Sequence, residues 1–131
     1  MAQNSGSAQP EEIGPYIIFY DWHPTSYEDL REYRNELAPE AKMVLDYMLE
    51  SLGDHPYQIR IVSYTSEDRQ RSLYEEVGRR RYEQARNYLI SRGIDEDLIT
   101  GEILIAESRV PMADGVREMQ YRRSELILTP L

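Results

Sequence analysis

The chain has 131 residues, which is enough for one domain of ordinary size and too few for two. Its formal charge of −9 argues against a nucleic-acid partner, whose phosphates need a basic face, and against docking on an anionic lipid surface. Because the chain contains no cysteine, disulfides, thiolate catalysis and cysteine-ligated zinc are excluded.

The first 14 residues are mostly small and polar, and we predict that they form a flexible linker before a single domain at residues 15–131. They lack the apolar run of a signal peptide. No segment approaches the ~20 consecutive apolar residues of a membrane helix, so we expect no membrane insertion by this chain.

The first half of the domain predicts one strand followed by two helices. Residues 15–21 are rich in Tyr, Ile and Phe, which is typical of a strand. Residues 26–37 place Tyr and Leu at helical spacing. Residues 39–52 predict a second helix, because Pro39 fits a first turn and Gly53 provides a stop.

The second half predicts a strand, a helix and two further strands. Residues 57–64 alternate in polarity as a half-buried strand does. A polar loop at 65–71 leads to a capping pattern at Ser72, where a helix should begin and continue to Gly93. An acidic connection at 94–100, a strand at 102–106, a long loop at 108–120 and a strand at 123–128 complete the domain.

The element order β-α-α-β-α-β-loop-β predicts an α/β fold with helices on one face of a sheet. Five residues on the helices at 39–52 and 72–92 are predicted to pack against the sheet. They are Leu45, Met48, Leu49, Ala85 and Leu89.

Several segments in this order and spacing resemble the OmpA-like peptidoglycan-associated domain of bacterial envelopes. They are residues 16–22, 37–41, 88–94, 107–109, 113–118 and 122–123. The resemblance covers about residues 15–128 and implies a mixed sheet of about four strands. It also implies a non-enzymatic module that binds the diaminopimelate stem peptide of peptidoglycan. The expected location is the bacterial periplasm or the outer membrane, with any signal or anchor outside this sequence.

The resemblance also indicates a degenerate ligand pocket. Where the family has Gly-His-Thr-Asp, this chain has Ser63, Tyr64, Thr65 and Ser66. In the family the Asp pairs with the ammonium group of diaminopimelate, and a serine hydroxyl supplies no such charge. Losing one charged partner at a desolvated site costs ~2–5 kcal/mol, so binding should be weakened. Glu67 or Asp68 is a candidate substitute.

Other pocket positions are changed or retained. Arg81 matches the family arginine that meets a ligand carboxylate, while Tyr74, Tyr82 and Tyr121 stand where the family has Asn, Ala and Asn. Seven residues therefore make up the ligand set that the resemblance implies. They are Arg81, Ser66, Thr65, Tyr64, Tyr74, Tyr121 and Arg122.

An alternative function is a protein–protein interaction module, on a divergent or redesigned scaffold, that uses a Tyr- and Ser-lined face over the former pocket. Tyrosine buries contact area at low entropic cost, and the chain has 11 of them against one Phe and one Trp. The residues of this predicted face are Ser63, Tyr64, Tyr74, Tyr82 and Tyr121. Ordinary core or rim packing of these side chains is the competing interpretation.

No pattern predicts an enzyme, a cofactor or a metal site. His23 and His55 each precede a proline, without an acidic ligand at metal-binding spacing. The sequence has no Gly-rich phosphate loop, no nucleophile elbow and no His-Asp-Ser order.

Overall fold

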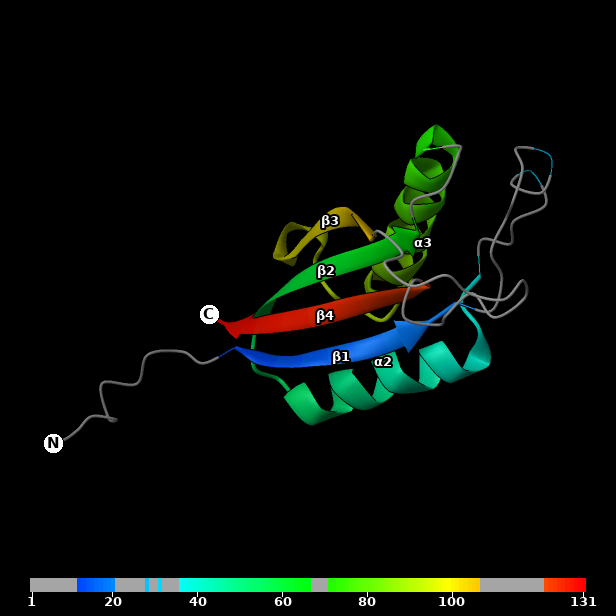
Figure 1. The fold of residues 1–131 in the computed structure, drawn as a ribbon. Coiled ribbons are helices and arrows are strands. Elements are labelled where there is room, and N and C mark those ends of the chain that lie inside the picture. The colour runs from blue at the N-terminus through cyan, green and yellow to red at the C-terminus, as the bar shows by residue number, and fades with distance from the viewer. Residues whose placement is uncertain (1–11, 21–27, 29–30, 32–35, 67–70, 107–121) are drawn as a thin grey trace, which may run out of the picture.

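The computed structural model describes residues 12–20, 28, 31, 36–66, 71–106 and 122–131 (Figure 1). The elements in chain order are β1 (Ile13–Phe19), α2 (Pro39–Leu52), β2 (Tyr57–Ser66), α3 (Arg71–Ser91), the 3-10 turn η2 (Glu96–Leu98), β3 (Ile99–Ala106) and β4 (Arg123–Pro130). The strands form one sheet in the order β1-β4-β2-β3. Because β2 pairs with β3 in parallel and with β4 antiparallel, the sheet is mixed, as predicted.

Most predicted elements are confirmed, with shifted ends. The strand β1 begins at Ile13, two residues before the predicted start, and β3 begins at Ile99 rather than at residue 102. The strand β2 continues through Ser66, so two residues of the predicted polar loop are extended. The predicted helix at 26–37 lies mostly outside the described residues, although Glu28 and Arg31 within it are helical. The predicted loop at 108–120 lies outside them entirely.

The helix α2 has the predicted bounds, and the residues at its ends explain why. Pro39 occupies the first turn, where its missing N–H leaves no hydrogen bond unmade. Gly53 follows the last turn with a φ of 59°, a left-handed value that glycine adopts without a steric cost, and its N–H donates to the Glu50 carbonyl.

Both α2 and α3 cover the same face of the sheet. Figure 1 shows α2 beside β1 and α3 beside β2 and β3, and these are the strands that each helix contacts most. Strand partners such as Ile61 and Leu126 point into the shared core. Four of the five predicted packing residues, Leu45, Met48, Ala85 and Leu89, are fully buried, and Leu49 packs against them half-buried.

The opposite side of the sheet, which we call the open face, carries no described helix. The alternation of the strands directs a second set of side chains to it. These include Ile17, Phe19, Arg60, Tyr64, Glu102, Leu104, Arg123 and Glu125. Leu104 keeps 40% of its surface exposed and Ile17 keeps 36%. Two ion pairs lie on this face, each at 2.8 Å: Arg60–Glu102 joins β2 to β3, and Arg123–Glu125 lies within β4.

A small residue faces a large one at two points where α3 meets β3. A Cβ on Gly78 of the helix would lie 2.5 Å from Cγ2 of Ile103. One helical turn later the small residue is on the strand and the large one on the helix. A Cβ on Gly101 of the strand would lie 2.0 Å from the Tyr82 ring. The two glycines therefore set how closely the helix approaches the strand.

We expect Gly101→Ala to lower the free energy of unfolding by about 1–3 kcal/mol, because the new methyl group overlaps the Tyr82 ring. Combining it with Tyr82→Leu, which removes the ring, should restore part of that loss. Urea denaturation of the two single variants and the double variant measures the coupling. Additive losses in the double variant would show that the ring is not the obstacle.

A polar contact fastens α2 to α3 at the edge of the core. The Tyr88 hydroxyl donates to Oδ1 of Asp46 at 2.7 Å, and Arg92 donates to Oδ2 of the same carboxylate at 3.1 Å. Burial, followed by the hydrogen bond to Asp46, raises the pKa of Tyr88 above its usual value.

No helix in the described ranges is long and apolar enough to cross a membrane.

Candidate ligand site at the end of the second strand

Arg81 is the centre of the predicted pocket, and the structure places it inside the domain with none of its surface exposed. Its Nη1 donates to the Tyr64 carbonyl at 3.2 Å, and its guanidinium carbon lies 5.3 Å from the centroid of the Tyr20 ring. The Tyr20 hydroxyl donates to the Arg81 carbonyl at 2.9 Å. Arg81 thus joins α3 to the ends of β1 and β2.

A chain of buried hydroxyl groups continues from Tyr20 into the sheet. The Tyr20 hydroxyl lies 2.8 Å from Oγ of Ser124, which lies 2.7 Å from Oγ of Ser63. Each hydroxyl has one proton, and Tyr20 gives its proton to a carbonyl that only accepts. The direction is therefore fixed: Ser63 donates to Ser124, and Ser124 donates to Tyr20. The hydroxyl groups of the two serines and of Tyr20 hold β2, β4 and the end of β1 in one arrangement.

Thr65 is fully buried beside this network. Its Oγ1 makes no hydrogen bond to any described residue, whereas most buried hydroxyls have a partner. Thr65 follows Tyr64 directly, and the Tyr64 carbonyl binds Arg81. A hydroxyl that has no partner among the described residues and a buried guanidinium therefore lie at the same end of β2.

Tyr64 and Tyr82 lie on opposite sides of the sheet. Because Ser63 and Thr65 point toward α3, Tyr64 between them points to the open face, where the Arg123 guanidinium carbon lies 3.8 Å above its ring. Tyr82 packs on the core over Gly101. Ser63 is fully buried. These three residues do not form the single face that the sequence predicted.

Comparison with solved structures identifies the fold. The chain matches the OmpA-like domain of FopA1 from Francisella tularensis subsp. tularensis SCHU S4 with a TM-score of 0.52 and 12% identity, over 75% of this chain and 69% of that one. The chain has an OmpA-like fold. No family model matches the sequence, and no curated protein matches it at a significant level.

Of the other residues in the predicted pocket, the structure describes some and leaves others outside its described ranges. Arg122 is half-buried, and its carbonyl accepts the Tyr20 N–H at 2.8 Å, next to the hydroxyl chain. Tyr121 and the substitute residues Glu67 and Asp68 lie outside the described residues, as do the side chains of Ser66 and Tyr74. His55 is exposed in the turn before β2, and His23 lies outside the described part.

Two residues of the site, Tyr20 and Ser124, were not among the predicted ones. A signal for Tyr20 existed in the alternation of β1, since Ile18 points into the core and Tyr20 is two positions further on. Ser124 similarly precedes the inward-facing Leu126 by two positions. The alternation gives the direction of both side chains but does not indicate which partners they meet.

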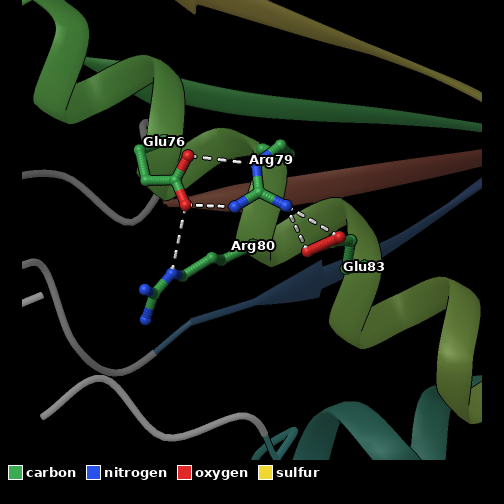
Figure 2. Close-up of polar contacts among 4 residues, drawn as sticks. All are labelled: Glu76, Arg79, Arg80 and Glu83. Atoms are coloured by element: carbon green, nitrogen blue, oxygen red, sulfur yellow. Dashed lines mark hydrogen bonds and ion pairs between the residues drawn. The ribbon is translucent and has the colours of Figure 1, made fainter. Parts of the chain in front are cut away.

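The arginines next to Arg81 belong to the solvent-facing side of α3. Figure 2 shows Arg79 between Glu76 and Glu83, with Arg80 reaching back to Glu76. The hydrogen bond from Arg79 lowers the pKa of the Glu76 carboxyl. Exposed helical pairs of this kind contribute ~0.3–0.5 kcal/mol each, so they support the helix and leave Arg81 as the inward-facing cation of this run.

Proposed function

We propose that this OmpA-like domain is a non-enzymatic envelope-binding module that takes a carboxylate-bearing stem peptide of peptidoglycan. The proposed location is the bacterial periplasm or the periplasmic side of the outer membrane. The observation that carries the proposal is the buried Arg81, which is held at the end of β2 by the carbonyl of Tyr64, the residue before Thr65. A guanidinium removed from water and fixed in position binds a carboxylate more strongly than an exposed one.

We further propose that binding is weaker than in OmpA-like domains that keep an acidic residue at the Ser66 position. Diaminopimelate carries both a carboxylate and an ammonium group at its free end. Arg81 supplies the partner for the first, and Ser66 offers no charge for the second. The ligand is therefore held by one charged contact in place of two.

The protein-interaction alternative has weaker support. It requires the tyrosines to share one surface, and Tyr64 and Tyr82 are separated by the sheet. Aromatic residues act as binding hot spots when they cluster at the centre of one patch. We therefore favour binding of a peptidoglycan stem peptide over a protein-interaction function.

We expect Ser66→Asp to increase affinity for a diaminopimelate-containing stem tetrapeptide by at least about tenfold, because it restores the anionic partner of the ammonium group. Ser66→Asn is the matched control, because asparagine has the shape of aspartate without its charge. This variant should leave the affinity unchanged. NMR titration of ¹⁵N-labelled protein measures both. Equally tight binding by the unmodified chain and Ser66→Asp would contradict the account of the missing charge.

A second peptide separates the role of Arg81 from that of residue 66. The same tetrapeptide with lysine in place of diaminopimelate keeps the ammonium group and loses the carboxylate. We expect it to bind more weakly than the diaminopimelate peptide to every variant. Equal binding of the two peptides would show that Arg81 does not contact the ligand carboxylate.

A further inference from the structure

The two edges of the sheet differ in how they are protected. In the order β1-β4-β2-β3, the edge strands are β1 and β3. The strand β1 contains Pro15, and its register with β4 shifts between Ile13 and Tyr16. Prolines, irregular pairing and covering elements are the usual means by which proteins prevent an edge from accepting another strand.

The strand β3 carries a helix on its core-facing side, as β1 does, but it lacks the other two protections. Its eight residues contain no proline and no lysine, and they pair with β2 in unbroken parallel register from Ile99 to Ala106. Its single charged residue, Glu102, binds Arg60 of the neighbouring strand through Oε1 at 2.8 Å. Both side chains of this pair remain nearly half exposed, so Glu102 can still meet a second basic partner.

The outer side of β3 is accessible. Thr100, Gly101, Glu102 and Leu104 are exposed, and in the described part of the chain β2 is the only strand that pairs with β3. Alternate backbone N–H and C=O groups of an edge strand point away from its one partner. These groups form a row that another extended chain can complete.

We propose that the outer edge of β3 is a docking site for an extended segment of a partner protein, which adds to the sheet as a fifth strand. Only an extended backbone matches a row of alternating donors and acceptors. This surface is separate from the site around Arg81, so the proposal does not depend on the ligand proposed there.

The side chains beside the edge define the chemistry of the segment. On the open face, Leu104 offers an apolar contact, and Glu102 two residues earlier offers a carboxylate. The exposed acidic residues Asp95 and Asp97 stand just before the strand, on either side of Glu96, which pairs with Arg86 at 3.0 Å. An antiparallel segment would therefore place an apolar residue opposite Leu104 and a basic residue two positions later, opposite Glu102.

A second copy of the chain is a poor occupant. The strand β3 contains no lysine or arginine to meet Glu102, and each copy carries a net charge of −9. The segment is expected to come from a different protein with a basic, alternating sequence.

The test uses a capped eight-residue peptide with valine and arginine alternating on one face and threonine on the other, together with a twin that is N-methylated along one edge. We expect the unmethylated peptide to shift the amide NMR signals of residues 99–104 and to slow their hydrogen exchange. N-methylation should abolish both effects because it removes the backbone donors. No binding at millimolar peptide, or equal binding of the twin, would overturn the proposal.

Two lysine substitutions locate the surface. Leu104→Lys should weaken peptide binding roughly two- to fivefold, because it replaces an apolar cross-strand contact by a like charge. Ile17→Lys, at a residue of similar exposure on β1, should leave binding unchanged. Equal effects of the two would place the peptide on the open face instead of the edge. Slowed exchange at 99–104 that depends on protein concentration without peptide would show that a second copy is the occupant.

Discussion

Leu89→Ala is expected to lower the free energy of unfolding by ~2–5 kcal/mol, the range for large-to-small substitutions in well-packed cores. Leu89 is fully buried on α3, where it packs with Leu45 and Met48 of α2 and with the sheet. The substitution removes buried apolar surface and leaves a cavity in the core. Urea denaturation gives the loss, with an unchanged slope as the check that unfolding remains two-state.

Leu104→Ala is the matched control for this prediction. The same side chain is removed from a position on the open face with 40% of its surface exposed. Its loss should be well below that of Leu89→Ala, because less apolar area returns to water. Similar losses for the two variants would mean that α3 does not pack on the sheet as described.

Arg81→Met is expected to lower the free energy of unfolding by about 2–4 kcal/mol. Two effects oppose each other here. Methionine fills much of the volume of the arginine stem and removes a charge from a dry environment, which is favourable. The Tyr64 carbonyl, however, loses its charged donor, and the Tyr20 ring loses the cation above it. We expect the second effect to dominate, because a buried acceptor without a donor retains its full desolvation cost.

Arg79→Met tests whether this loss is specific to the buried position. Arg79 lies two residues earlier on the solvent-facing side of α3 and is held by Glu76 and Glu83 (Figure 2). Its replacement should cost less than ~1 kcal/mol. Full stability of Arg81→Met would show that the buried guanidinium costs as much as it contributes, and would favour a role for Arg81 in binding alone.

The sequence was most informative where one residue type restricts the conformation of the backbone. Pro39 and Gly53 fixed both ends of α2, and the alternation at Ile59 and Ile61 identified the buried face of β2. The start of β3 was placed too late because Thr100 and Gly101 have little strand character. That segment is extended because of its pairing with β2, a tertiary effect that local composition does not contain.

The site was only partly predictable for the same reason. Val77, Arg81 and Ala85 are four residues apart, so helical spacing already put Arg81 on the apolar stripe of α3. The alternation of β2, extended to Tyr64, also puts that ring on the face away from the helices. The resemblance predicts that Tyr64 and Tyr82 share one pocket. It aligns positions in the sequence and does not give the directions of the side chains. The hydrogen bond between Tyr20 and Ser124 joins residues 104 positions apart, and no local pattern predicts it.

The contact between Gly101 and Tyr82 has a consequence for how this domain can change over time. A methyl group at position 101 is blocked while the ring is present, but a smaller residue at position 82 removes only a half-buried side chain. Replacing Tyr82 first is therefore tolerated and makes room for a larger residue at position 101. Replacing Gly101 first is opposed, because the ring is still in place. Natural variation at the two positions should be correlated, and descendants of this chain should retain the glycine for as long as they retain the tyrosine.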